Sequence, residues 1–118
     1  MEMKLTPRFY QDGERIFGPG VAELMQQVQV HRSLRSAAQA MEMAYSKAWR
    51  IIRNAEEGFG CKLLNSTIGG RNGGGAVLTP EAERLLAAYE AYCADVGTYA
   101  QGKFEDAFRF YRDLDHRP

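Results

Sequence analysis

Long apolar runs, closely spaced cysteines and an excess of charge of one sign are all missing from this 118-residue sequence. No apolar run approaches the roughly 18 residues of a membrane-spanning helix, which argues against an integral membrane protein. The N-terminus lacks the apolar segment of a secretory signal peptide, so we expect a cytoplasmic protein. Cys61 and Cys93 are too far apart for a metal-binding motif, and in a reducing compartment we expect both to be free thiols.

The sequence also contains little that could carry out catalysis. His31 and His116 stand alone, and there is no Ser-His-Asp set, no metal-ligand spacing and no evident pair of catalytic carboxylates. The glycine-rich stretch at 69–75 lacks the lysine and Ser/Thr that open a helix after a nucleotide-phosphate loop. We therefore expect that the protein is not an enzyme and that it needs no cofactor or metal.

The formal net charge is zero, but the charges are distributed unevenly along the chain. Residues 28–76 contain seven basic and three acidic residues, a net charge of +4. Residues 81–118 contain five basic and eight acidic residues, a net charge of −3. The middle of the chain is therefore suited to phosphates, whereas the C-terminal part is suited to water or to another protein.

The N-terminal half is predicted to form a hairpin and then two helices. Residues 8–17 have the pattern of two short strands that turn at Asp12 and Gly13. Pro19 is placed to open a first helix, whose apolar residues recur with helical spacing. Ser33 is a good N-cap for a second helix.

A third, amphipathic helix is predicted over residues 44–57. At 100° per residue its apolar residues collect on one side: Ala44, Ala48, Ile51, Ile52 and Ala55. The opposite side is polar: Ser46, Arg50, Arg53 and Glu57, flanked by Lys47 and Asn54. We expect Trp49 to be a partly buried packing residue, and Tyr45 either packs or contacts a phosphate.

Two further strands and a long helix are predicted to complete the chain. Residues 62–68 and 76–78 would pair through the glycine-rich tip, and Thr79 and Pro80 form a strong helix start. The helix carries an apolar stripe at spacings of four and three: Leu85, Tyr89, Tyr92, Val96 and Tyr99. An amphipathic piece with Phe104, Phe108 and Tyr111 either continues this helix or forms a separate one.

This order of elements predicts a mainly α-helical fold with a small β-hairpin wing, the winged helix-turn-helix arrangement. We expect residues 1–80 to form a DNA-binding domain and residues 81–118 a helical dimerisation segment. The third helix would enter the major groove of double-stranded DNA, and the wing would reach phosphates or the minor groove. The residues expected to contact DNA are Ser36, Tyr45, Ser46, Lys47, Arg50, Arg53, Asn54, Arg71 and Asn72.

Four segments also resemble a known family. They are FGPGVAEL (17–24), SLRSAAQAM (33–41), YSKAW (45–49) and GGRNGGGAVLTP (69–80). Over residues 9–92 the chain resembles the N-terminal DNA-binding domain of the ModE family of molybdate-responsive transcription regulators, a domain that is similar to the LysR-type winged domain. The chain departs from the family pattern at Ala44 and Ser46, where a serine and a lysine are usual.

The resemblance implies a transcription regulator that is linked to molybdenum metabolism. It also implies a stand-alone DNA-binding protein, because the C-terminal oxyanion-binding domains of the family have no counterpart here. The helix after the wing contributes to dimer contacts in the family, which implies a homodimer held by the stripe from Leu85 to Tyr99.

Two alternatives remain open at this point. A winged domain can act as a protein-interaction module without specific DNA binding. The C-terminal helix could also fold back on its own domain, with Gly97 and Gly102 allowing the bend.

Overall fold

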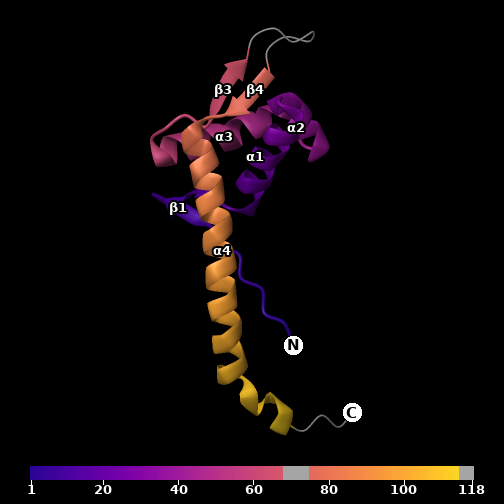
Figure 1. The fold of residues 1–118 in the computed structure, drawn as a ribbon, viewed down its shortest axis with the longest axis vertical. Helices are drawn as coiled ribbons and strands as arrows, with labels where there is room; N and C mark the ends of the chain where they lie inside the picture. The colour runs from indigo at the N-terminus through magenta and orange to yellow at the C-terminus, as the bar shows by residue number, and fades with distance from the viewer. Residues whose placement is uncertain (68–74, 115–118) are drawn as a thin grey trace.

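The computed structural model describes residues 1–67 and 75–114, which form a globular part and one long projecting helix (Figure 1). The globular part begins with an antiparallel hairpin of β1 (Phe9–Gln11) and β2 (Glu14–Phe17). The turn residues Asp12 and Gly13 both have positive φ, of 52° and 82°. Short hairpins favour this geometry at both central positions, and an Asp-Gly pair tolerates it. The predicted first hairpin is therefore confirmed.

Three helices follow: α1 (Pro19–His31), α2 (Leu34–Ala40) and α3 (Tyr45–Phe59). The Oγ of Ser33 accepts a hydrogen bond from the N–H of Ser36 at 3.1 Å, which confirms the predicted N-cap of α2. α3 begins one residue later than predicted. Ala44 has an extended backbone there and is exposed, so it does not belong to the buried side of the helix.

The second hairpin, β3 (Leu64–Thr67) and β4 (Gly75–Leu78), is the predicted wing. β3 begins two residues later than predicted, because Leu63 turns into the core. Leu63 is completely buried, and its N–H donates to the Oε2 of Glu56 on α3 at 2.8 Å instead of to a neighbouring strand. The predicted end of this strand at residue 68 lies outside the described residues.

The chain then forms α4 (Pro80–Ala107), a single helix of 28 residues. Thr79 caps it as predicted, since its Oγ1 accepts the N–H of Ala82 at 3.0 Å. α4 runs without interruption through Gly97 and Gly102, so the bend that these glycines could allow is absent. A short 3₁₀ helix, Arg109–Asp113, follows α4. In the part of the chain that the structure describes, no helix is long and apolar enough to cross a membrane.

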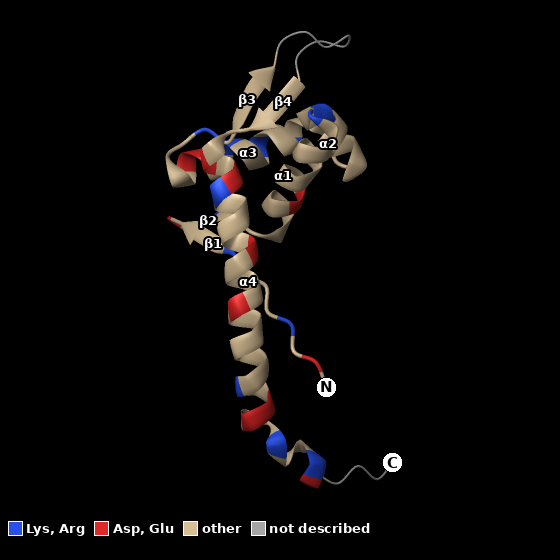
Figure 2. Cartoon of the chain, in the orientation of Figure 1, with Lys and Arg blue, Asp and Glu red and all other residues tan. Residues whose placement is uncertain are grey.

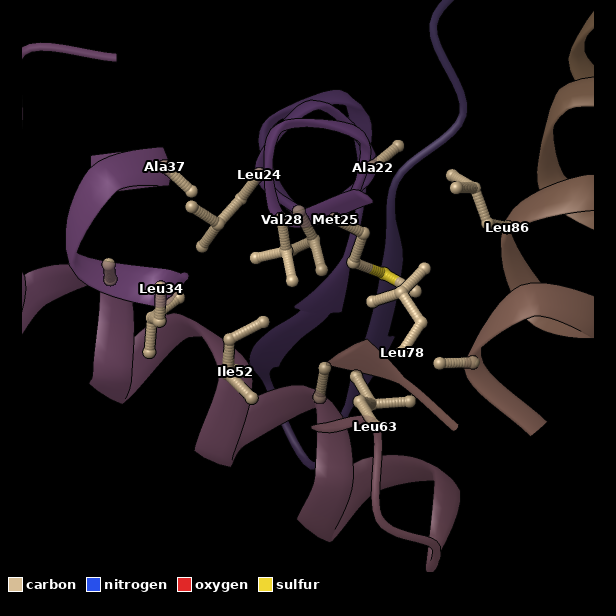
Figure 3. Packing of buried hydrophobic residues seen from close by; sticks show 14 of the residues in the cluster. Ala22, Leu24, Met25, Val28, Leu34, Ala37, Ile52, Leu63, Leu78 and Leu86 are labelled. Atoms are coloured by element: carbon tan, nitrogen blue, oxygen red, sulfur yellow. The ribbon is translucent and has the colours of Figure 1, made fainter. Parts of the chain in front are cut away.

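The core lies between α1, α3, the wing strands and the first turns of α4 (Figure 3). Leu24, Met25 and Val28 of α1 are completely buried. The first turns of α4 contribute further residues to the same core: Ala82, Leu86 and Tyr89. The two segments that we expected on either side of residue 80 therefore share one core.

Candidate nucleic-acid interface

α3 lies at one end of the globular part, beside the wing. Its apolar side is buried at Ala48, Ile52 and Ala55, as the sequence predicts. Ser46, Lys47, Arg50 and Arg53 are all exposed. Figure 2 shows basic residues on α2 and α3 at this end of the molecule, whereas acidic residues recur along α4. The fold thus presents a basic helix to solvent next to a hairpin.

A groove of about 490 Å³ separates α3 from the wing. Tyr45, Trp49 and Arg53, on successive turns of α3, line one wall. The groove is also lined by Arg35, from the first turn of α2, by Lys62 just before the wing and by Ser66 of the wing, among others. The residues that the sequence predicts to contact DNA do not include Arg35, Lys62 or Ser66. Their only signal was the positive charge of the segment, because their proximity depends on how α2 and the wing pack around α3.

Two arginines in this groove lie over aromatic rings. The Cζ of Arg35 is 4.3 Å from the centre of the Tyr45 ring, and the Cζ of Arg53 is 4.6 Å from the centre of the Trp49 ring. Such contacts restrict where the guanidinium points and leave its N–H groups free to donate. Trp49 is partly buried, as expected, but it does not pack against the core, and its side chain is 47% exposed.

Acidic side chains reduce the positive charge of this surface in two places. Glu56 lines the groove, and its Oε2 accepts a hydrogen bond from the N–H of Leu63, just before the wing. The Oε1 of Glu57 is 3.9 Å from the Nη2 of Arg53, and both side chains are mostly exposed. An exposed pair at this distance contributes little free energy. Arg53 can therefore exchange Glu57 for another acceptor.

These features coincide with the region matched in known proteins. The sequence signature of the family described as bacterial regulatory helix-turn-helix protein, lysR family, matches residues 22–83, from α1 into the first turn of α4. The chain belongs to the lysR family. The resemblance to ModE is confirmed by two curated relatives named as ModE regulators, from Haemophilus influenzae and Escherichia coli. They are 31% and 28% identical over 90 residues, or 76% of this chain and about a third of each relative.

A third relative of this lysR-family chain is the molybdenum-pterin-binding protein MopB of Rhodobacter capsulatus. It is 38% identical over 64 residues, which are 54% of this chain and 24% of MopB. The chain thus spans between a quarter and a third of the length of the curated relatives that it matches. Among solved structures, the DNA-binding domain of BenM in complex with benA site 1 DNA superposes with a TM-score of 0.51 at 23% identity, over 75% of this chain and 93% of that domain. This likeness confirms the winged fold.

The other predicted contact residues of the lysR-family chain are dispersed. Asn54 is half-buried and lies with Asp12 and Glu57 beside the turn of the first hairpin, away from the wing groove. Ser36 is half-buried at the start of α2. Arg71 and Asn72 lie outside the described residues. Within 1–67 and 75–114, no group of three or more His, Cys, Asp or Glu side chains could hold a metal ion.

The predicted dimerisation stripe on α4 is divided between the core and the surface. Tyr89 is 7% exposed, its ring meets Phe17 with 5.0 Å between centres, and its OH donates to the carbonyl of Pro7 at 2.7 Å. Burial, with a smaller contribution from Cys93, raises the pKa of Tyr89 to about 12. Tyr89 is thus engaged within its own chain. Farther along α4, Tyr92 and Tyr99 are 50% and 67% exposed.

Proposed function

We propose that this lysR-family protein is a sequence-specific regulator that binds double-stranded DNA with α3 in the major groove. The observation that carries the proposal is the exposed basic side of α3, which continues into a groove lined by Arg35 and Lys62. The major groove is wide enough for one helix. Phosphates of one strand would then contact Arg35 and Lys62. The BenM domain, which has the same fold, was solved with DNA.

The proposed contacts divide into two classes. Ser46 and Arg50 are exposed near the start and middle of α3 and would reach base edges, which carry the sequence information. Arg35 and Lys62 face the groove and would bind phosphates, which position the protein on the duplex. Arg71, which lies outside the described residues, stays a predicted phosphate or minor-groove contact.

The experiment is fluorescence polarisation with the full chain and labelled DNA, both random and selected from genomic fragments, at several salt concentrations. We expect selected sites to bind more tightly than random DNA, with affinity falling steeply as salt rises, by a slope of about −0.9 per neutralised phosphate. Arg50→Ala should weaken binding most on the selected site. The matched control is Arg109→Ala, which removes one exposed arginine from the 3₁₀ helix that follows α4 and should leave binding unchanged. Absence of binding at about 50 mM salt would contradict the proposal and favour a protein-interaction module.

We also propose that the protein acts as a homodimer through the outer half of α4. Tyr92 and Tyr99 are exposed there with Val96 half-buried between them, and the helix extends beyond the globular part (Figure 1). Pairing two such helices would remove this apolar surface from water and provide two α3 helices for half-sites about 34–36 Å apart. Leu85 and Tyr89 are covered by their own chain, and they would hold α4 in place instead of contacting the second copy.

Sedimentation equilibrium at micromolar concentration tests the dimer. Val96→Glu combined with Tyr99→Glu should convert a dimer into a monomer and abolish binding to the two-half-site operator. Thr98→Glu is the matched control, because Thr98 is exposed on a different side of α4. A wild-type monomer mass would contradict the dimer.

A link to molybdenum metabolism is also proposed, and its support is the similarity to MopB and to the ModE regulators. Chromatin immunoprecipitation from cells grown with and without molybdate tests it. We expect bound sites next to genes for molybdenum uptake or use. Sites that are unrelated to such genes and unaffected by molybdate would contradict the link.

A further inference from the structure

Trp49 is the largest side chain on α3, yet it contributes nothing to the core. Nearly half of its surface is exposed. Its aromatic contact among the described residues is the guanidinium of Arg53, one helical turn farther along α3. An indole that faces water on a surface otherwise suited to DNA is more informative than an isolated apolar side chain elsewhere. Its position indicates that it has a partner outside the chain.

Arg53 is held by this ring while its N–H groups stay accessible. The side chain is 51% exposed, and its ion pair with Glu57, at 3.9 Å, is long. Stacking on the indole limits the guanidinium to fewer orientations, which reduces the entropy lost when it binds a rigid acceptor pair. Trp49 and Arg53 are four residues apart, about 6 Å along the helix axis. Because the guanidinium lies 4.6 Å from the centre of the indole, the two groups can meet adjacent base pairs.

We propose that Trp49 and Arg53 together recognise a thymine next to a guanine, an inference that rests on the proposed function. In the major groove the C5-methyl of thymine is the exposed apolar group that an indole face can cover. Guanine presents two acceptors, O6 and N7, which match the paired donors of a guanidinium. Adenine and cytosine each place an amino donor in this groove, which opposes a side chain that can only donate.

The proposal gives Trp49 two separable effects. Contact with the methyl group contributes directly to affinity for thymine. Stacking on Arg53 contributes indirectly, since without the ring the guanidinium is free to turn toward Glu57 or a phosphate. Loss of Trp49 should therefore weaken discrimination at both base pairs, whereas loss of Arg53 should weaken it mainly at the guanine.

The test uses the full chain and the site that it prefers in a selection from random duplexes. At the proposed step, deoxyuridine replaces thymidine, which removes one methyl group, and 7-deazaguanine replaces guanine, which removes the N7 acceptor. We expect wild-type affinity to fall about fourfold with deoxyuridine, which is the effect of losing one buried methyl-sized group. We expect it to fall about tenfold with 7-deazaguanine. Trp49→Ala should show no loss with deoxyuridine, and Arg53→Ala no loss with 7-deazaguanine.

Two further variants keep the result interpretable. Trp49→Phe retains a ring and should retain part of the deoxyuridine effect. Lys47→Ala removes a charge from another side of α3. It should lower affinity for DNA but leave the fold losses caused by deoxyuridine and by 7-deazaguanine unchanged. Trp49→Ala should keep the wild-type fold, checked by its circular dichroism spectrum, since the side chain lies outside the core.

The outcomes separate this inference from the proposed function. If the wild type selects no site, the proposed function fails. If it selects a site but no thymine in that site responds to deoxyuridine, or if Trp49→Ala responds as strongly as the wild type, the recognition of the thymine–guanine step is wrong while DNA binding stands.

Discussion

The N–H of Ala76 donates to the carbonyl oxygen of Arg32 at 3.0 Å, and this bond ties β4 of the wing to the turn between α1 and α2. Arg32 has a left-handed backbone with φ of 55°, and its own N–H closes α1 by donating to Val28. The end of α1 thus presents a carbonyl to the wing. Ala76 also lines the groove beside α3, so this bond holds one of the lining residues in place.

Gly75 is the residue that lets β4 approach this turn. A Cβ at this position would lie 2.7 Å from the oxygen of Arg32 and 2.5 Å from the Oγ1 of Thr67. We expect Gly75→Ala to displace the wing, to lower the free energy of unfolding by about 1–3 kcal/mol and to weaken DNA binding. Gly20→Ala is the control, because nothing lies within 4 Å of its added Cβ. Urea unfolding and DNA titration of both variants provide the measurement, and equal stability of the two would contradict the prediction.

Glu56 combines a structural role with an unfavourable charge. Its Oε2 accepts the Leu63 N–H at 2.8 Å, yet Glu56 lines the same groove as Arg35 and Lys62, which are proposed to bind phosphates. Glu56→Gln keeps an acceptor and removes the charge, so DNA affinity should rise several-fold at low salt, and this gain should shrink as salt rises. Glu56→Ala should instead lower stability by about 1–3 kcal/mol, because a partly buried N–H loses its partner. A lower affinity for Glu56→Gln at unchanged stability would place the phosphates elsewhere.

Thr79 connects the wing to α4 through one hydroxyl group. Its Oγ1 accepts from the Ala82 N–H at 3.0 Å and donates to the carbonyl of Lys62 at 2.7 Å, and the residue is buried. Thr79→Val has nearly the same shape but loses both hydrogen bonds, and we expect it to lower the free energy of unfolding by about 1–3 kcal/mol. Thr79→Ser retains the hydroxyl and should lose less. Denaturant unfolding of the two variants checks this, and a loss for Thr79→Ser equal to or larger than that for Thr79→Val would contradict the prediction.

The raised pKa of Tyr89 predicts a stability loss in alkaline solution. Its pKa is about 12 in the folded protein against an ordinary value of 10.0. As the pH rises, the unfolded chain therefore releases this proton before the folded protein does. The contribution of Tyr89 to the free energy of unfolding is complete below pH 10 and is lost as the pH rises toward 12. Tyr89→Phe removes this titration and should shift stability by a constant amount through the lost bond to Pro7. The free energies of unfolding of wild type and Tyr89→Phe should be compared from pH 9 upward. The wild type should lose stability relative to Tyr89→Phe between these two pKa values, and a constant difference would contradict the raised pKa of Tyr89.

Sequence alone determined the features that depend on neighbours in the chain. The Asp12–Gly13 turn, the caps at Ser33 and Thr79, and the buried side of α3 follow from local backbone preferences and helical periodicity. The order of these elements was sufficient to predict the winged fold, because few arrangements bury all of their apolar faces at once.

Tertiary structure decided the features that depend on which surfaces meet. Tyr89 and Tyr92 are similar in the sequence pattern, but the first hairpin and the N-terminal segment cover Tyr89 and leave half of Tyr92 exposed. The sequence predicts Trp49 only as a partly buried packing residue, and the packing of α2 and the wing makes it part of a groove. Arg35 and Lys62 are 27 positions apart in the sequence and line the same groove only in the folded chain. Periodicity assigns a residue to a side of its own helix, but its burial depends on what another element places against that side.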